Sequence, residues 1–170
     1  DAPILRYDAL LVFLVAVQVM FVASRLETPR ELLVVCIFHI LGLVLEIFKV
    51  AAGSWEYPES GIATVAGVPL YAGFMYAAVG SYICQAFRRF DLGLGNYRIA
   101  VVGTLAMLAY VNFFTHHLIG DFRFPLLVAF LLATIRMRVW FTVGDDRYWM
   151  PLPLSFVLIG LFLWIAENIA

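Results

Sequence analysis

The side chains best suited to proton chemistry are His39 and Glu46, which stand in an otherwise apolar run. They are seven residues apart, close to two helical turns, so a helix would present both on one face with Gly42 between them. An ionisable residue inside an apolar helix is costly and typically marks a functional polar site. We therefore take both as candidate catalytic residues. The alternative is a buried histidine satisfied by a neighbouring helix and a Glu46 carboxylate paired with Lys49.

A second carboxylate, Glu167, follows Trp164 near the end of the last apolar run. If Glu167 faces inward, it meets Glu46 at the same depth. Two carboxylates that share an apolar pocket take different protonation states, which makes them a catalytic acid and base. The alternative is an ordinary membrane interface, where a charge beside a tryptophan is expected.

Two adjacent histidines, His116 and His117, shortly precede Asp121. His117 and Asp121 are four residues apart, which on a helix suits a histidine–carboxylate pair or two metal ligands. Adjacent side chains on a helix point about 100° apart, so at most one histidine shares that face. His117 is thus a candidate proton relay, and all three residues are candidate metal ligands. The alternative is that the histidines simply lie at an interface.

The turn that follows Glu46 has the sequence GSWEYPE at 53–59. Its glycine and proline fix the backbone directly over the end of the Glu46 helix, where a loop can cap a pocket. We predict that this turn forms the wall or lid of a substrate pocket, through Trp55, Glu56, Tyr57, Pro58 and Glu59. The alternative is an aromatic belt at the membrane surface, which also accounts for Tyr148 and Trp149.

The elements that position these residues are predicted to be membrane helices. The 170-residue chain is 64% hydrophobic and only 14% charged, and its mean hydropathy is +0.96, more than a soluble domain of this size can bury. The sequence predicts an all-α fold, a polytopic transmembrane helical bundle that forms one domain over 1–170. Six apolar runs, about one per spanning helix, lie at 7–24, 32–52, 68–87, 99–114, 124–141 and 152–170.

Two of these runs are weaker than the rest. The fourth is short, and the fifth contains Arg136 and Arg138, which must reach the headgroups or a polar interior. The third run carries Gly73, Ala77 and Ser81 at four-residue spacing. Such a stripe of small residues lets membrane helices approach closely, so the third helix is predicted to be central.

The distribution of positive charge predicts the orientation. Eight of the eleven Lys and Arg residues lie in the loops after the first and third runs, or in the last part of the fifth run and the loop after it. Because basic residues concentrate on the cytoplasmic side, these loops should be cytoplasmic and both ends of the chain non-cytoplasmic. The loops at 53–67 and 115–123 then share the non-cytoplasmic face. A net charge of −1 without a basic run argues against a nucleic-acid partner and leaves the lipid bilayer as the expected one.

Several long motifs carry a family resemblance: EIFK at 46–49, GSWEYPE at 53–59, GVPLYAGFMYAAVGSYICQA at 67–86, NFFTHH at 112–117, SFVLIG at 155–160 and WIAENIA at 164–170. With them the chain resembles, over essentially its whole length, the bacterial membrane proteins catalogued as domain of unknown function 817. The resemblance implies a multi-pass protein of the inner membrane and brings no established activity or cofactor. Family members carry further sequence before and after, so the chain is expected to be a fragment or the ordered part of a longer protein.

A fainter likeness is to membrane carotenoid cyclases and hydratases. It rests on a glutamate, then Trp-x-Tyr, then a Val-Pro-Leu helix start. The likeness implies a polyene substrate that carboxylates protonate inside a helical bundle. The chain departs from the cyclase pattern, because Leu70-Tyr71-Ala72 stand where that pattern has paired carboxylates.

Three functions are compatible with these residues. The first is a membrane-embedded enzyme for an isoprenoid, carotenoid or lipid, with Glu46 and Glu167 as acid and base and His39 and His117 as relays. The second is a small-solute transporter or binding module that uses the same residues, favoured by a slight repeat between 40–43 and 158–161. The third is an accessory subunit whose polar residues pair with partners in a membrane complex. Substrate, cofactor and oligomeric state stay unspecified.

Overall fold

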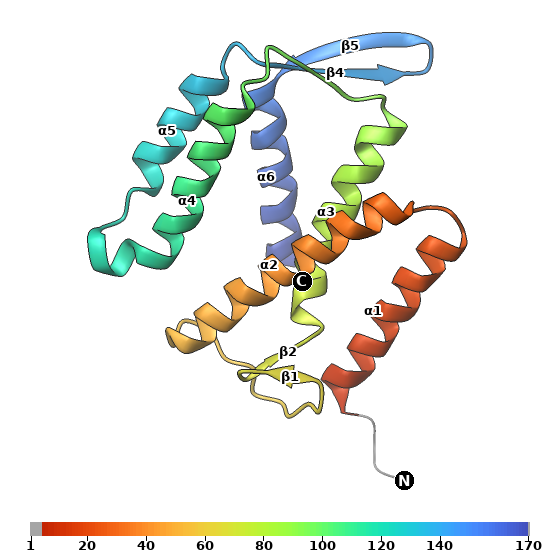
Figure 1. Ribbon diagram of the computed structural model, residues 1–170, viewed down its shortest axis with the longest axis vertical. Helices are drawn as coiled ribbons and strands as arrows, with labels where there is room; N and C mark the ends of the chain where they lie inside the picture. The colour runs from red at the N-terminus through yellow and green to blue at the C-terminus, as the bar shows by residue number, and fades with distance from the viewer. Residues whose placement is uncertain (1–4, 170) are drawn as a thin grey trace. The chain divides into compact units, whose positions relative to one another are not determined.

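The computed structural model describes residues 5–169, which form six α-helices and five short β-strands. The helices are α1 (Arg6–Ala23), α2 (Pro29–Ala51), α3 (Ala72–Arg89), α4 (Ile99–Ile119), α5 (Arg123–Thr134) and α6 (Leu152–Ile169). The strands are β1 (Thr64–Val65), β2 (Val68–Pro69), β3 (Gly93–Gly95), β4 (Arg138–Val143) and β5 (Asp146–Pro151). Figure 1 shows that helices dominate the chain. The chain divides into two compact units, Asp1–Ala86 and Phe87–Ala170.

Among the described residues, three helices are long and apolar enough to cross a membrane: α1, α2 and α4. The sequence predicted about six, so the structure supports half of that number. A helix of 12 residues, such as α5, is about 18 Å long, well short of a bilayer core of about 30 Å. α3 has 18 residues but ends in Arg88 and Arg89.

The predicted helical fold is confirmed in part: the chain is mostly helical, but five strands are present, and the longest departure from helix lies in the fifth apolar run. The helix there ends at Thr134, and the run continues into β4, which pairs with β5 in an antiparallel hairpin. Val139, Trp140 and Phe141 are residue types that favour strands. Gly144, with φ of 63°, begins the two-residue turn between the strands. An apolar run by itself does not reveal this turn, so the hairpin was not predicted.

The first unit is built on the contact between α2 and α3. Three glycines allow this contact, because a Cβ on Gly42 would overlap the Tyr76 ring, one on Gly80 would lie 2.9 Å from Phe38, and one on Gly73 would lie 2.7 Å from the His39 carbonyl oxygen. Gly73, Ala77, Gly80 and Ser81 are all buried. The stripe of small residues predicted from the sequence is therefore the packing face of α3.

The second unit combines a helix pair with a small sheet. α4 and α5 lie side by side and run in opposite directions, as Figure 1 shows in green and teal. The sheet has the order β3-β4-β5. Its core is a small apolar cluster of Val102, Met137, Val139 and Leu152.

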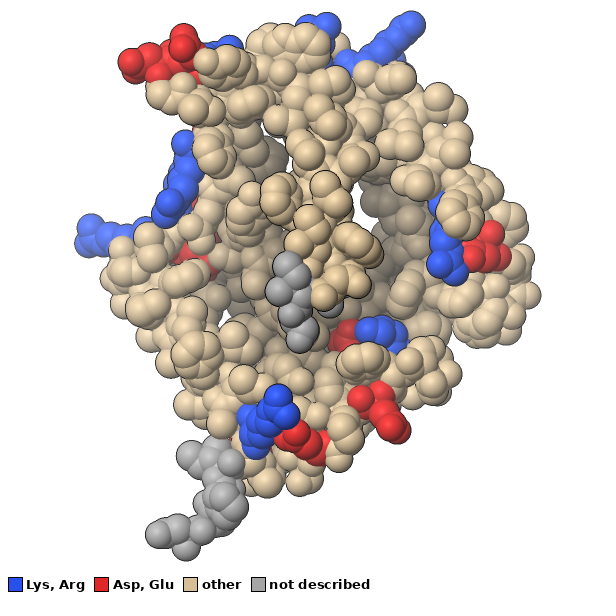
Figure 2. All heavy atoms as spheres, turned by 180° about the vertical axis from the view of Figure 1, so that it is seen from behind, with Lys and Arg blue, Asp and Glu red and all other residues tan. Residues whose placement is uncertain are grey.

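Much apolar surface stays exposed within each unit. On α1 alone, Val12, Phe13 and Val19 are 66%, 62% and 61% exposed. Figure 2 shows that charged side chains on the face in view are few and stand in small separate groups. Exposed apolar helices of this kind are compatible with a membrane protein.

Candidate functional site

Glu46 is the most completely enclosed carboxylate of the predicted site, with 2% of its surface exposed. Its Oε1 accepts hydrogen bonds from Lys49 Nζ at 3.0 Å and from Tyr76 Oη at 2.7 Å, and its Oε2 accepts one from Tyr57 Oη at 2.8 Å. Three donors therefore converge on one buried carboxylate. We call Glu46, Lys49, Tyr57 and Tyr76 the Glu46 centre.

Each donor is placed by a local feature of the sequence. Lys49 lies three residues after Glu46 in the last turn of α2, where a positive charge is also favoured by the helix dipole. Gly53, with φ of 67°, follows the end of α2 in the left-handed region that glycine adopts without cost, and the chain turns there toward Tyr57. Tyr76 comes from α3, where its ring packs on Gly42.

Hydrogen bonds and ring contacts join the loop after α2 to the start of α1. The Asp8 carboxylate accepts hydrogen bonds from the backbone N–H groups of Ile62 and Ala63, both at 2.9 Å. Tyr57 and Tyr71 also pack against the Tyr7 ring, with centroid distances of 6.0 and 5.3 Å. The loop is thus held at the same end of the unit as the Glu46 centre.

The five residues predicted as a lid occupy different positions in this loop. Tyr57 points inward to Glu46, whereas Trp55, Glu56, Pro58 and Glu59 are exposed. Glu59 forms an exposed ion pair with Arg6 at 2.8 Å. The Lys49 ammonium lies 5.3 Å from the Trp55 ring centroid, a cation–π distance. The loop therefore covers the Glu46 centre with one inward phenol and one outer indole.

Tyr57 is electrostatically tuned by its surroundings. Burial, followed by the hydrogen bond to the Glu46 carboxylate, raises the pKa of its phenol well above the ordinary 10.0. Burial likewise raises the pKa of Tyr71. Tyr57 consequently remains a protonated donor to Glu46 through the physiological pH range.

His39, the second predicted catalytic residue, lies against α3. Its ring stands edge-on to Phe74 at 4.6 Å between centroids, and a Cβ on Gly73 would come within 2.8 Å of it. Its Nδ1 atom is buried and has no hydrogen-bond partner among the described residues. His39 and Glu46 therefore both contact α3, and His39 keeps an unused polar atom inside the unit.

Glu167 was predicted as the partner of Glu46. Its backbone belongs to α6, but its side chain lies outside the described residues. Its role stays a prediction.

The predicted metal ligands do not gather into one site. α4 extends to Ile119, further than the sequence analysis expected, and Gly120 with φ of 107° ends it before Asp121. Asp121 is therefore off the helix, and the expected four-residue spacing on one face is lost. In the part of the chain that the structure describes, no group of three His, Cys, Asp or Glu side chains could hold a metal ion.

Each of these three residues has other contacts. His116 Nδ1 lies 2.8 Å from the Phe113 carbonyl oxygen, and the His117 ring stands edge-on to the His116 ring at 5.5 Å. Asp121 Oδ2 pairs with Arg123 Nε at 2.6 Å. The hydrogen bond from the Arg123 backbone N–H lowers the pKa of Asp121, which is therefore an acceptor.

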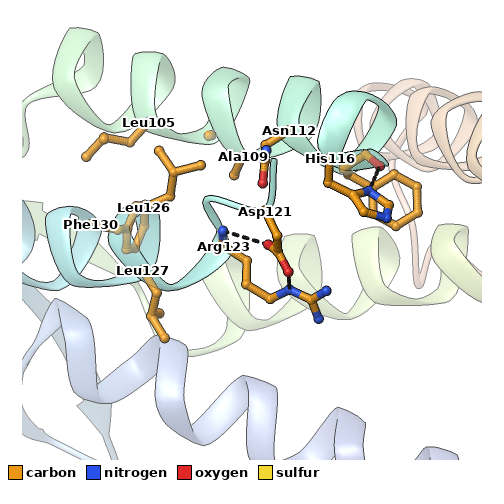
Figure 3. Close-up of a pocket in the computed structure, with 11 residues that line it drawn as sticks. Leu105, Ala109, Asn112, His116, Asp121, Arg123, Leu126, Leu127 and Phe130 are labelled. Atoms are coloured by element: carbon orange, nitrogen blue, oxygen red, sulfur yellow. Dashed lines mark hydrogen bonds and ion pairs between the residues drawn. The ribbon is translucent and has the colours of Figure 1, made fainter. Parts of the chain in front are cut away.

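A cleft of about 470 Å³ lies between α4 and α5 in the second unit. Figure 3 shows apolar side chains along one part of it, and His116, Asp121 and Arg123 at the other. Asn112 lies between and fixes the turn, since its Nδ2 donates to the Gly120 carbonyl at 2.9 Å and its Oδ1 accepts from the Phe122 N–H at 3.1 Å. The cleft is thus amphiphilic and suits a mainly apolar molecule with one polar end.

A second buried carboxylate, Glu27, was not predicted from the sequence and is 2% exposed. It accepts hydrogen bonds from Gln18 Nε2 and Ser81 Oγ, and Ser81 Oγ accepts one from Gln85 Nε2 at 3.2 Å. Glu27 stands near Arg25 and Arg30 in a short connection, which resembles a solvated loop. A signal was available, because Gln18, Ser81 and Gln85 are polar residues within otherwise apolar helices.

Taken together, the fold and the two buried carboxylates define a mostly helical protein with apolar helices of membrane-spanning type. The chain belongs to the family described as "Protein of unknown function (DUF817)", whose model matches residues 1–170. This finding confirms the resemblance seen in the sequence.

One relative is the "Uncharacterized protein YoaT" of Bacillus subtilis (strain 168), which is 51% identical over 166 residues. The match covers 97% of this chain but 63% of the relative, so the chain spans less than two thirds of that protein's length. No solved structure matches the chain.

Proposed function

We propose that the protein is a multi-pass protein of the bacterial inner membrane that carries out acid–base chemistry on a hydrophobic substrate at the Glu46 centre. The single observation behind this proposal is the buried Glu46 carboxylate, which receives hydrogen bonds from two phenols and an ammonium near the end of a candidate membrane span. Acidic residues in such helices are expensive and are usually retained for a function.

The proposed chemistry is a proton exchange at carbon. A substrate that displaces one phenol would meet the Glu46 carboxylate as a base and a phenol or the Lys49 ammonium as an acid. Adding a proton to one carbon of a double bond and removing one from a neighbouring carbon leaves atoms and electrons balanced without a co-reactant. An isoprenoid, a carotenoid or an unsaturated lipid would suit this reaction and would enter from the bilayer.

The other predicted residues have supporting roles in this proposal. His39, with its unpartnered Nδ1, would pass protons to the centre. Glu167 and His117 belong to the second unit and stay candidate residues for proton transfer. Tyr57 and Trp55 would close the site toward water.

The test is a comparison of lipid extracts from cells that lack the gene and express the full-length protein or a variant. Glu46→Gln preserves the shape of the side chain and removes its base. The wild type should change the amount of at least one unsaturated lipid, and Glu46→Gln should leave the profile of the deletion strain. Asp145→Asn, an exposed change in the β4–β5 turn, is the matched control. A normal profile in folded Glu46→Gln would contradict the proposal.

A second function, proton-coupled transport of a small solute, is favoured by His39. This residue lies near the middle of α2, a candidate membrane span, and its buried Nδ1 atom has no hydrogen-bond partner among the described residues. Transporters usually place their sites near the middle of the membrane. In reconstituted vesicles with a pH gradient, a transporter would dissipate the gradient when its solute is added, and His39→Gln would abolish the effect. If the vesicles keep their pH gradient with every solute tested, the transport proposal is wrong.

A further inference from the structure

The first unit contains a polar cluster that the proposed function does not use. It consists of Gln18 on α1, Glu27 in the connection to α2, and Ser81 and Gln85 on α3, joined by the hydrogen bonds described above. We call these four residues the Glu27 cluster. Glu46 takes no part in it, since the partners of Glu46 are Lys49, Tyr57 and Tyr76.

The Glu27 carboxylate is enclosed by uncharged partners. Glu27 is 2% exposed, yet its hydrogen-bond donors, Gln18 and Ser81, are both neutral. Within residues 5–169, no Lys or Arg nitrogen lies within 4.0 Å of the Glu27 carboxylate. Its place just before the capping residue Thr28 puts it at the positive end of the α2 dipole, which stabilises an anion there. Burying a charge without a partner is costly, so the cluster is suited to receive a cation.

A groove of about 270 Å³ adjoins this cluster. Three members of the cluster, Gln18, Ser81 and Gln85, line it, and the rest of its wall is apolar or aromatic. Because the Nε2 atoms of both glutamines donate within the cluster, their amide oxygens remain as acceptors. Phe21, Phe74 and Tyr82 also line the groove. Aromatic rings attract a cation that approaches their faces.

We propose that this groove binds an organic cation with an apolar body, such as a hydrophobic amine or quaternary ammonium compound. The negative cluster would take the charged head, and the apolar wall would take the rest of the molecule. An anion would be repelled by Glu27, and a bare metal ion would leave the apolar wall unused. The combination of a buried carboxylate, amide oxygens and aromatic rings is the arrangement that recognises ammonium groups.

The experiment is equilibrium binding of radiolabelled hexyltrimethylammonium to the full-length protein in uncharged detergent. Glu27→Gln keeps the size of the side chain and removes its charge, and Asp145→Asn removes an exposed charge in the second unit. We expect Glu27→Gln to weaken binding at least about tenfold and Asp145→Asn to leave it unchanged. The uncharged analogue with carbon in place of nitrogen should bind no more tightly to the wild type than to Glu27→Gln.

A second variant keeps the test decisive if Glu27→Gln fails to fold. Gln85→Met removes an amide from the groove without touching Glu27, and should also weaken the binding. Glu46→Gln should bind the probe like the wild type, which separates this site from the proposed catalytic centre. Equal binding by wild type and the two groove variants, or equal binding of the neutral analogue, would show simple partition into the micelle and overturn the proposal.

Discussion

Tyr57 is the residue through which alkaline pH should act on the Glu46 centre. Burial and the Glu46 carboxylate raise the pKa of its phenol above 10.0, the value expected in the unfolded chain. Above pH 10.0 the folded state therefore holds a proton that the unfolded state has lost. Stability that is fully present below pH 10.0 must consequently decline as pH rises beyond it.

We expect Tyr57→Phe to reduce this alkaline decline. Phenylalanine keeps the ring contacts and removes the phenol, so the proton linkage at this position disappears. The measurement is thermal unfolding in detergent as a function of pH. Trp55→Phe, which alters the same loop without removing a phenol, should retain the decline. An identical pH profile for wild type and Tyr57→Phe would contradict the assignment.

Asn112 should be a stabilising residue of the second unit. It is 7% exposed, and its amide bridges the Gly120 carbonyl and the Phe122 N–H across the turn between α4 and α5. Asn112→Leu keeps the volume and removes both hydrogen bonds, so we expect a loss of about 1–2 kcal/mol in the free energy of unfolding.

Thr115→Val is the matched control for Asn112. The Thr115 hydroxyl donates only to the Val111 carbonyl of its own helix, so its removal should change the unfolding transition very little. Equal effects of the two substitutions would show that the Asn112 bridge contributes no more than an ordinary helix position.

Some residues of the candidate site could be predicted from the sequence. Glu46 and His39 were recognisable because an ionisable side chain in an apolar helix is conspicuous, and Tyr57 because it stands in a turn beside it. Glu27 was not recognisable as buried, since a carboxylate near two arginines in a short connection normally faces water. Its burial depends on Ser81, which is 54 residues away in the sequence.

Among the elements, the contact of α2 with α3 should be sensitive to a single added methyl group. A Cβ on Gly42 would overlap the Tyr76 ring, and moving that ring would also pull its hydroxyl away from Glu46. We expect Gly42→Ala to destabilise the protein by about 1–3 kcal/mol.

Gly103→Ala on α4 is the natural control, because nothing lies within 4 Å of the added carbon. Alanine is the better helix former, so this change should be neutral or stabilising by up to about 1 kcal/mol. Unfolding in detergent should therefore show a loss of stability for Gly42→Ala and none for Gly103→Ala. The same sign and size for both would mean that α2 and α3 are not closely packed.

The helices could be predicted from the sequence, but the β4–β5 hairpin could not. Apolar runs predicted the existence of all six helices, because hydropathy is a local property. The β4–β5 hairpin was missed because an apolar run of Val, Trp and Phe fits a helix or a strand, and the difference lies in the turn at Gly144 and in pairing partners such as Trp140 and Trp149. Hydropathy alone also predicted a span at α5, although this helix ends at Thr134 after 12 residues.

For the whole molecule, the positive charges predict on which side of the membrane each loop lies. Single cysteines can test this in a background where Cys36 and Cys84 are replaced by alanine. Ser60→Cys should react with a membrane-impermeant maleimide in intact cells, and Asp145→Cys should react only after permeabilisation. Labelling of both, or of Asp145→Cys alone, in intact cells would contradict the proposed orientation.

A third position decides whether α3 crosses the membrane. Asn96→Cys lies after α3 and before α4. If α3 crosses, this cysteine should behave like Asp145→Cys. Labelling like Ser60→Cys would place α3 on one side of the membrane and leave fewer than six crossings.

The glycines of the α2–α3 contact have a consequence for the genetics of this family. Every glycine codon becomes an alanine codon by one base change, so this substitution arises repeatedly during evolution. Gly42, Gly73 and Gly80 have no room for the added carbon, whereas Gly103 and Gly160 have nothing within 4 Å of it. Natural variants should therefore often carry alanine at Gly103 and Gly160 and almost never at Gly42, Gly73 and Gly80. The close contact of α2 with α3 should thus be detectable in the sequence variation of the family.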